Sequence, residues 1–218
     1  MSDILVIGGG VIGLLTAREL AASGADVTLV EMGETGRESS WAGGGIISPL
    51  YPWRYDESVT ALARWSQAVY PELCATLRDE SGIDPEYIAT GMLILDEHEQ
   101  EDALSWAATH GAVVEIIDAD AAHTHEPGLG LRPKSAMWLP EIAQVRNPRL
   151  TKALRRSIER EVRVREHEEV VELLVDQGRA AGARTRKETI QADKVVVCTG
   201  AWTAKLLEQL GTKPEIEP

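Results

Sequence analysis

Apolar residues near the N-terminus form short runs separated by glycines and polar residues. Ile4 to Ile7 is an apolar run that leads directly into Gly8-Gly9-Gly10, a pattern typical of a buried parallel strand. From residue 11 to 23 the apolar positions recur at helical spacing, and Gly24 ends this helix. A second apolar strand follows at 27–30 and ends at Glu31. The pattern therefore predicts a β-α-β unit.

The remainder of the chain alternates between strand and helix patterns. Residues 33–48 are rich in Gly and Ser and are predicted to form a loop. A loop of this length is usually functional or disordered, and the apolar residues in it favour an ordered loop. The other predictions are a helix at 57–80 kinked or broken at Pro71, a strand at 91–95, a helix at 97–110 closed by Gly111, a strand at 113–117, a connection at 118–135, a helix at 148–161 after Asn147, strands with turns at 177–178 and 181–182 over 162–193, a strand at 194–198 and a helix at 201–210.

Three glycines give the first strand-to-helix turn a recognisable chemistry. Gly8, Gly10 and Gly13 form the pattern G-x-G-x-x-G. In dinucleotide-binding units the first glycine permits a tight turn, the second lets a pyrophosphate approach, and the third lets the helix pack closely. The helix N-terminus offers free N–H groups to that pyrophosphate. Glu31, at the end of the next strand, can accept both ribose hydroxyls, which disfavours the 2′-phosphate of NADP. The pattern therefore predicts a dinucleotide-binding site rather than a glycine-rich turn that binds no nucleotide.

The composition of the chain argues against several classes of function. The 218 residues carry 22 Lys and Arg against 35 Asp and Glu, a net charge of −13, which argues against nucleic acid and anionic membranes as partners. No apolar run approaches the ~18 residues of a membrane span, and no signal-peptide pattern precedes the first strand. The two cysteines give no disulfide framework, so a cytoplasmic location is expected. His123 and His125 are too weak a pattern to predict a metal site.

Two later segments favour FAD over NAD, which shares the glycine pattern. The stretch Ser39-Ser40-Trp41-Ala42-Gly43-Gly44-Gly45-Ile46 has small residues in series, so its backbone can lie against a flat ring or a diphosphate. The run Val195-Val-Val-Cys-Thr-Gly-Ala-Trp202 is a late buried strand, which would return to the same sheet and bring Thr199 and Gly200 to the same crevice.

With these segments in place, the sequence resembles the FAD-dependent D-amino-acid oxidase superfamily, in its glycine oxidase branch linked to thiazole (thiamine) biosynthesis. The segments that carry the resemblance are ILVIGGGVIGLLTARELAASGADVTLVE, SSWAGGGIISPLYPWRY, ATGMLIL, LPEIAQVRNPRLTKAL and ADKVVVCTGAWTAKLL. They extend along essentially the whole chain. Full-length members are considerably longer, so the chain is similar to the N-terminal portion of such an enzyme.

The resemblance implies a set of cofactor-binding residues. Glu38 is left out of this set, because an acid beside a diphosphate is unfavourable unless it points away. Because Ala42 follows Trp41, the covalent flavin linkage that some relatives make through a His is not expected, and FAD is predicted to bind non-covalently. The implied residues are Gly8, Gly10, Val11, Ile12 and Gly13 at the pyrophosphate, Glu31 and Met32 at the ribose, Ser39 and Ser40 at the diphosphate, Gly43, Gly44 and Gly45 beside the flavin, Val170 at the adenine, and Thr199, Gly200 and Trp202 closing the site.

The resemblance also implies an activity. It is the oxidative deamination of glycine, a small D-amino acid or a secondary amine, with hydride transfer to flavin N5, hydrolysis of the imine and reoxidation by oxygen to peroxide. The residues that bind the substrate are expected beyond Pro218, so no catalytic residue is assigned. Two alternatives stay open: a catalytically incompetent FAD-binding fragment, and a quinone-linked D-amino-acid dehydrogenase.

The expected architecture is α/β, with a Rossmann-like FAD-binding domain of the glutathione reductase type built from 1–52 and 141–218. Residues 53–140 are expected to begin an inserted, incomplete α+β substrate domain, with the C-terminal remainder of the family fold absent. An incomplete sheet would expose an edge, which favours association into a homo-oligomer.

Overall fold

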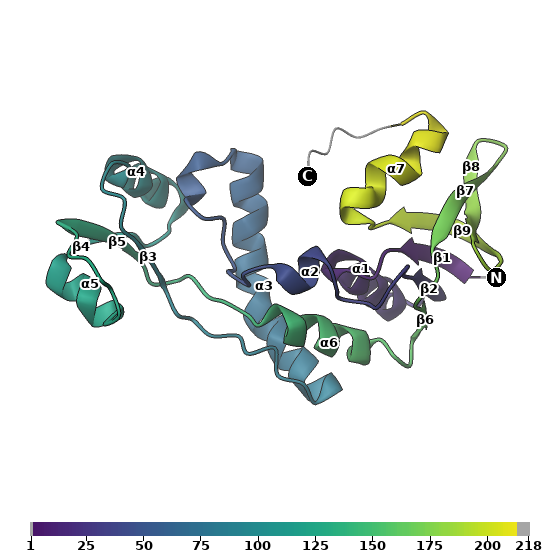
Figure 1. Ribbon diagram of the computed structural model, residues 1–218, viewed down its shortest axis with the longest axis horizontal. Coiled ribbons are helices and arrows are strands. Elements are labelled where there is room, and N and C mark those ends of the chain that lie inside the picture. Colours follow the sequence, from purple (N-terminus) through teal and green to yellow (C-terminus); the bar gives the residue numbers. More distant parts are fainter. Residues whose placement is uncertain (1, 213–218) are drawn as a thin grey trace. The chain divides into compact units, whose positions relative to one another are not determined.

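The computed structural model describes residues 2–212 and divides the chain into two compact units (Figure 1). Unit 1 comprises the chain from its N-terminus to Gly44, Thr76–Pro85, and the chain from Asn147 onward. Unit 2 comprises Gly45–Ala75 and Glu86–Arg146. The first segment of unit 1 ends eight residues before the predicted boundary at 52, its last segment begins six residues after the predicted boundary at 141, and unit 1 also takes in 76–85. That the units are a cofactor domain and a substrate domain stays a prediction.

Unit 1 is built on a six-stranded sheet with the order β6-β2-β1-β9-β8-β7. The strands β6, β2, β1 and β9 run parallel to one another, whereas β8 pairs antiparallel with both β9 and β7. The strands are β1 (Ser2–Ile7), β2 (Val27–Val30), β6 (Val162–Arg165), β7 (Val170–Asp176), β8 (Arg179–Thr185) and β9 (Thr189–Val197).

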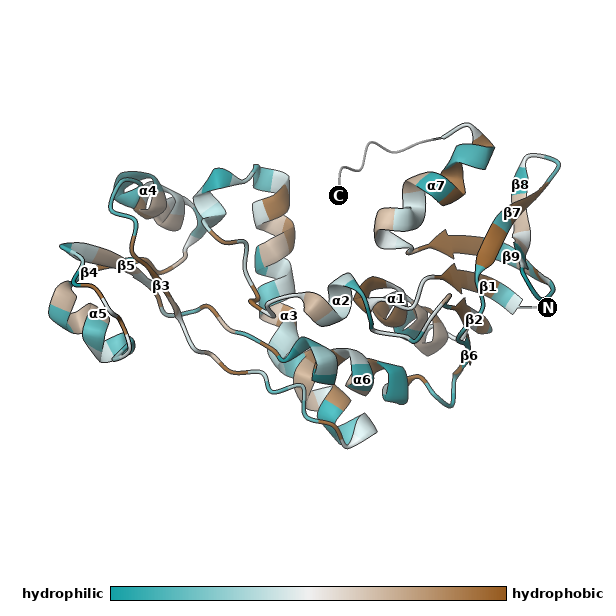
Figure 2. Cartoon of the chain, viewed as in Figure 1, coloured by the Kyte–Doolittle hydropathy of each residue, from teal (hydrophilic) through white to brown (hydrophobic). Residues whose placement is uncertain are grey.

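Strand β1 lies inside this sheet, and its apolar residues supply both faces of the core. Leu5 and Ile7 form one buried cluster with Leu206 of the C-terminal helix α7 (Thr203–Leu207). Ile4 and Val6 alternate to the opposite face. Figure 2 shows β2, most of β1 and the C-terminal part of β9 as hydrophobic. A strand buried on both faces reads as a continuous apolar run, which is why the sequence pattern found it.

Helices cover the sheet and connect its strands. In Figure 1, α1 and α6 lie on one side of the sheet and α7 lies on the other. The helices of unit 1 are α1 (Val11–Ala22), α2 (Ser39–Ala42), α6 (Asn147–Ser157) and α7, which is flanked by the short 3₁₀ helices η2 (Gly200–Trp202) and η3 (Glu208–Leu210). The helix predicted at 201–210 is therefore divided into these three pieces. The predicted loop at 33–48 contains α2.

Unit 2 holds a three-stranded antiparallel sheet with the order β3-β5-β4. Its core gathers Ile94, Met137, Leu139 and Ile142, and Ala103 packs onto it from a helix. The elements are η1 (Pro52–Arg54), β3 (Met92–Ile94), α4 (Gln100–His110), β4 (Glu115–Asp118), α5 (Ala119–His125) and β5 (Ser135–Leu139).

Helix α3 (Glu57–Ser81) is continuous, with Pro71 inside it. Of the kink or break predicted at Pro71, the break is therefore wrong, and the kink stays a prediction. A proline removes one backbone N–H and restricts the residue before it, but the flanking turns of a long helix can hold the helix together. The last residues of α3 belong to unit 1, where Glu80 forms an ion pair with Arg18 of α1 at 3.0 Å.

Two further sequence predictions are corrected by the structure. The stretch 118–135 is not only a connection: α5 begins at its start, where the Asp118 carboxylate accepts from the N–H groups of Asp120 and Ala121. Residues 181–182 do not form a turn but lie within β8. Gly182 has φ +133, and a Cβ there would come within 2.0 Å of the Ile190 carbonyl oxygen, so this glycine serves close strand packing. The turn predicted at 177–178 is confirmed, between β7 and β8.

Candidate cofactor site

The glycine turn lies at the carboxyl end of β1, next to the carboxyl end of β9. Gly8 has φ +105, and a Cβ on it would lie 2.4 Å from the carbonyl oxygen of Cys198. A Cβ on Gly13 would lie 1.8 Å from the carbonyl oxygen of Gly8. Gly10 is less crowded, because a Cβ on it would lie 3.1 Å from Ser40 Oγ. Two of the three glycines are therefore required by packing, and the third keeps space open beside the turn.

Helix α1 presents its N-terminus at this turn. Its first turn carries no acidic side chain, so the positive end of its dipole is not neutralised there. The Val11 N–H donates to the Ser40 hydroxyl at 2.9 Å, and the Ile12 side chain is 63% exposed. This arrangement suits an anion such as a diphosphate, because backbone N–H groups and dipole point the same way.

Glu31 is held in place by two backbone donors. Its carboxylate accepts from the N–H of Gly9 at 2.7 Å and from the N–H of Gly33 at 2.8 Å, one on each oxygen. The side chain is half-buried. An ionised carboxylate has about four acceptor positions, so two hydrogen bonds orient it and leave capacity for ribose hydroxyls. Met32, which follows, is exposed.

The Ser39–Gly45 stretch lies near these elements through its first part. Ser40 contacts α1 as described, and α2 itself has no buried residue. A Cβ on Gly43 would lie 2.6 Å from Asn147 Nδ2, whereas a Cβ on Gly44 would meet nothing within 4 Å. Gly45 begins unit 2 and has φ +76. Glu38 has φ 56, and its exposed side chain makes no cap hydrogen bond to α2, so its exclusion from the diphosphate site stays a prediction.

The end of β9 supplies a second wall beside the glycine turn. The Cys198 N–H donates to the Ile7 carbonyl at 2.7 Å, so the two strands end side by side. Thr199 follows, and its hydroxyl lies 3.0 Å from that of Thr203. Gly200 has φ +52, and Trp202 is exposed. Burial raises the pKa of the Cys198 thiol, as expected for a structural rather than a nucleophilic cysteine.

Val170 lies away from these residues in the strand order, at the start of the edge strand β7. It is half-buried and packs on the cluster around Leu5. The residues that contact the Glu31 segment are instead in the turn before it. His167 N–H donates to Gly33 O at 3.0 Å and Glu168 N–H donates to Glu31 O at 2.9 Å. A role of Val170 at the adenine stays a prediction, and no sequence pattern indicated the turn residues His167 and Glu168.

Other candidate side chains have structural partners. Arg54 pairs with Glu99 at 2.5 Å and lies 3.9 Å over the Tyr51 ring, so it is a surface residue of unit 2. His125 stacks on Trp138 at 3.9 Å between ring centroids. Within residues 2–212, no group of three or more His, Cys, Asp and Glu side chains is arranged to hold a metal ion. None of the helices in that same part of the chain is long and apolar enough to cross a membrane.

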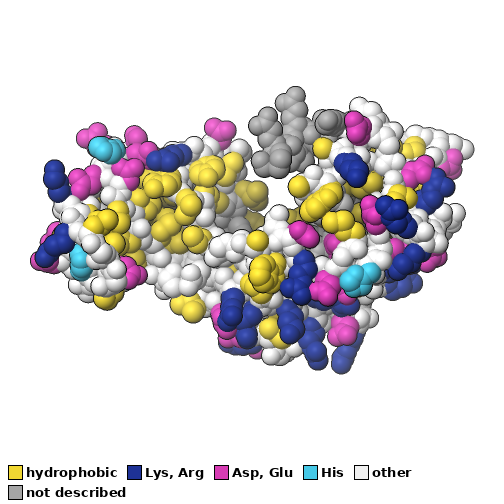
Figure 3. Space-filling model, viewed as in Figure 1, with side chains coloured by type: hydrophobic (Ala, Val, Ile, Leu, Met, Phe, Trp, Pro, Cys, Tyr) yellow, Lys and Arg dark blue, Asp and Glu magenta, His cyan; other side chains and the backbone are white. Residues whose placement is uncertain are grey.

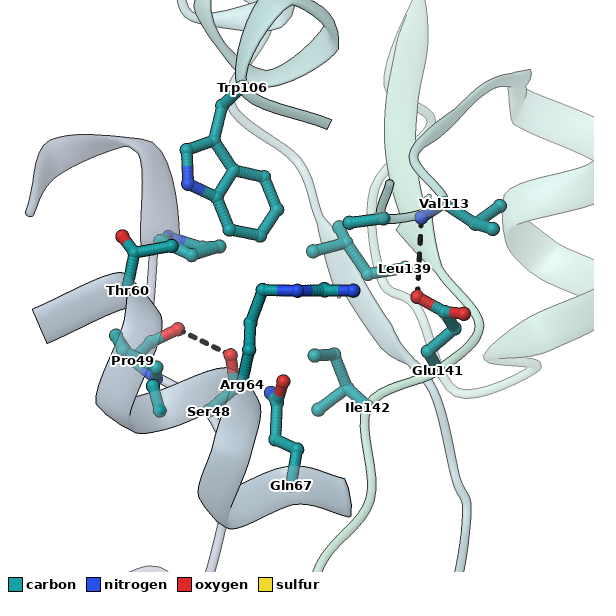
Figure 4. A pocket seen from close by; sticks show the side chains of 13 residues that line it. Ser48, Pro49, Thr60, Arg64, Gln67, Trp106, Val113, Leu139, Glu141 and Ile142 are labelled. Carbon is teal, nitrogen blue, oxygen red and sulfur yellow. Dashed lines mark hydrogen bonds between the residues drawn. The ribbon is translucent and has the colours of Figure 1, made fainter. Parts of the chain in front are cut away.

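Unit 2 has a small pocket of about 30 Å³, shown in Figure 4. Thr60, Arg64 and Gln67 reach it from α3, and Trp106 reaches it from α4. The indole N–H of Trp106 is buried without a hydrogen-bond partner. The volume suits about one water molecule. None of the predicted cofactor residues lines this pocket, so it is separate from the glycine turn.

Four parallel strands, a glycine turn at the N-terminus of α1 and an oriented acid at the end of the second strand together define a dinucleotide-binding protein. FAD fits these residues, because the glycines carry no side chain that would block its diphosphate and the Glu31 carboxylate is already oriented to accept from its ribose hydroxyls. The chain belongs to the FAD dependent oxidoreductase family, whose model matches residues 3–218. This match confirms FAD as the cofactor predicted from the sequence, and together with the likeness to solved glycine oxidase structures it confirms the predicted fold class.

The chain is similar to proteins described as glycine oxidases. It is 48% identical over 217 residues to the glycine oxidase of Pseudomonas aeruginosa, covering 99% of this chain and 60% of that protein. It is 31% identical over 218 residues to the bifunctional protein ThiO/ThiG of Trichormus variabilis, covering 94% of this chain and 32% of that protein. The crystal structure of glycine oxidase from Geobacillus kaustophilus superposes with a TM-score of 0.89 at 29% identity, over 96% of this chain and 58% of that chain. The chain thus spans about 60% of the length of the curated glycine oxidases from the two Pseudomonas species that it matches.

Proposed function

We propose that this chain supplies the FAD-binding part, and the beginning of the substrate-binding part, of an amine oxidase acting on glycine or another small amine. The carrying observation is the joint geometry of the glycine turn, the α1 N-terminus and Glu31, with the carboxylate already fixed by two backbone N–H groups. The 48% identity to a glycine oxidase supports the choice of substrate class. The likeness to ThiO/ThiG supports a role in thiazole biosynthesis.

The residues divide the work of holding the cofactor. Gly8 and Gly13 bring β1 and α1 close enough for the helix N-terminus to face the diphosphate, and Glu31 binds the ribose. Ser40 accepts from Val11, so its own hydroxyl proton is free to donate to a diphosphate oxygen. When bound, FAD supplies the two-electron acceptor for the amine. Oxygen as the final acceptor, non-covalent attachment, a cytoplasmic location and a homo-oligomeric state are parts of the same proposal.

A specific observation favours a second candidate, an FAD-binding fragment without catalysis. Unit 2 exposes many large apolar side chains, and Figure 3 shows hydrophobic side chains gathered on its visible face. On α3 alone, Leu62 is 66% exposed and Trp65 is 68% exposed. A body that exposes this much apolar surface is typical of a binding face that another segment or chain covers. The glycine oxidase relative carries further sequence beyond the matched part.

The first test is the visible absorption spectrum of the purified 218-residue protein, followed by titration with FAD and mass spectrometry of any released cofactor. Bound FAD with oxygen consumption on glycine, sarcosine or D-alanine would support the oxidase. Bound FAD without turnover would favour the fragment. Turnover with a quinone analogue and none with oxygen would favour a dehydrogenase. Binding of NAD in place of FAD would contradict the proposal.

A further inference from the structure

Thr35 is held at both its backbone and its side chain by one carboxylate that is distant in sequence. Its N–H and its hydroxyl each donate to Glu166 Oε1 at 2.7 Å, across a separation of 131 residues. Glu166 directly follows β6, the strand that pairs with β2. Two donors on one carboxylate oxygen fix both partners, and bonds to a charged acceptor are stronger than neutral ones.

Thr35 in turn packs on the glycine turn. The Thr35 methyl group lies so close to Gly9 that a Cβ on Gly9 would be 2.7 Å from it. The next residue, Gly36, donates its N–H to the Gly9 carbonyl at 2.8 Å. Gly9 then donates its own N–H to Glu31 at 2.7 Å. A continuous set of contacts therefore leads from Glu166 through Thr35 and Gly9 to the predicted ribose carboxylate.

The turn that carries Glu166 is itself anchored. Glu168 is buried, and its carboxylate accepts from Arg165 Nε at 2.9 Å and from the Thr185 hydroxyl at 2.7 Å. Its backbone N–H donates to the Glu31 carbonyl at 2.9 Å. A buried carboxylate held by a guanidinium and a hydroxyl resists rearrangement, because losing either partner leaves buried charge less well paired. Glu166 therefore acts from a fixed base.

Ionisation of Glu166 is consistent with this arrangement. Burial, the largest single influence, raises its pKa, but the hydrogen bonds from the Thr35 N–H and hydroxyl, together with the charges of Arg155 and His167, lower the pKa below its ordinary value. The group is therefore a carboxylate at neutral pH. Its charge faces Thr35, so the Thr35 donors satisfy it.

We propose that Glu166 is a positioning residue of the dinucleotide site: through Thr35 it holds residues 33–37 against the glycine turn, so that Gly9 and Glu31 are fixed before the dinucleotide arrives. The ligand in this inference rests on the proposed function. Prior ordering strengthens binding because less freedom is lost when the ligand enters. Glu166 makes no contact with the ligand in this role.

The test combines two readouts on the 218-residue protein. Amide hydrogen exchange is followed at Thr35, Gly36 and Gly9, and FAD affinity is followed by flavin fluorescence titration. Glu166→Ala removes the acceptor, and Glu166→Gln retains one acceptor oxygen as a conservative rescue. The matched control is Glu169→Ala. Glu169 lies three residues after Glu166 in the same segment, and the variant removes its surface ion pair with Arg186.

We expect E166A to speed exchange at Thr35 and Gly36 at least tenfold and to weaken FAD binding about tenfold. E166Q should restore most of both, and E169A should change neither. Thr35→Val, which keeps the shape and the N–H bond but removes the hydroxyl bond, should fall between wild type and E166A, and it decides the question if E166A does not fold.

Three results would overturn the inference: unchanged exchange in E166A, faster exchange without any loss of FAD affinity, or an equal loss in E169A. If the wild-type chain binds no FAD, the proposed function fails for this chain. The exchange data then decide the positioning role by themselves, because retained protection at Thr35 in E166A contradicts it and lost protection supports it.

Discussion

Replacement of Gly13 by alanine separates two opposite expectations. Gly13 lies in the first turn of α1, where helix propensity alone makes alanine better than glycine by about 0.5–1 kcal/mol. The structure predicts the reverse, because a Cβ at this position would lie 1.8 Å from the Gly8 carbonyl oxygen. That oxygen belongs to the backbone of the glycine turn, so no side chain can rotate away. Helix α1 or the turn must move by more than about 1 Å to relieve the contact.

Such a displacement has a predictable size in stability. Overpacking of a filled site costs about 1–3 kcal/mol and occasionally more, and a backbone contact belongs at the upper end. After the gain in helix propensity, a net loss of about 2 kcal/mol remains. For a chain of this size that loss corresponds to a fall of about 4–8 °C in Tm. FAD affinity should fall at least tenfold as well, because the N-terminus of α1 moves away from the diphosphate.

Thermal unfolding followed by circular dichroism, together with FAD titration, tests this prediction. Gly44→Ala is the matched control, since its Cβ meets no atom within 4 Å. This control should change Tm little, and it should weaken FAD binding if the loop lies against the flavin. A Gly13→Ala protein as stable as wild type, or more stable, would refute the argument that close packing of α1 on the turn requires glycine.

Three further predictions follow from single contacts. Glu31→Ala should weaken FAD binding by at least tenfold in a fluorescence titration while the protein stays folded, because the ribose acceptor is lost; unchanged affinity would contradict its role. Replacing Leu62 and Trp65 by serine should lower the fluorescence of a bound hydrophobic dye with little change in Tm, since both side chains are mostly exposed in the described structure; a large fall in Tm would show that they are packed. The Glu57 carboxylate, the largest influence, raises the pKa of His110, so Glu57→Gln should lower that pKa in an NMR titration. The stability lost in this variant should be full below about pH 6.5 and vanish as the pH rises through the raised pKa, and a pH-independent difference would contradict the ion pair.

Local patterns were sufficient for the first β-α-β unit. The apolar run of β1, the helical spacing of α1 and the glycine after it are each decided by neighbouring residues, so the sequence predicts them and the structure confirms them. The same reasoning missed α5, which lies within the predicted connection at 118–135, and β5, which begins where that connection ends. The Asp118 cap was the available signal, since its side chain accepts from two N–H groups at the start of α5.

Other assignments depended on contacts that no local pattern reveals. Pro71 indicates a break when read locally, yet α3 continues through it. Gly182 indicates a turn when read locally, yet it is a strand residue whose missing Cβ makes room for the Ile190 carbonyl. Tertiary packing outweighs local preference at both positions, because a long helix and a paired strand gain more from continuing than the one residue loses.

The sequence by itself determined the chemistry of the candidate site: glycines at fixed spacing, an acid at the end of the second strand, and small residues after it. Only the tertiary structure decided what holds that chemistry in place. Glu166 and Thr35 are far apart along the chain, and their pairing exists because β6 lies beside β2 in the sheet. The spacing of residues along the chain determines which functional groups a turn or a helix brings together. The side chains that orient those groups are brought in by the order of strands in the sheet, which neighbouring residues do not encode.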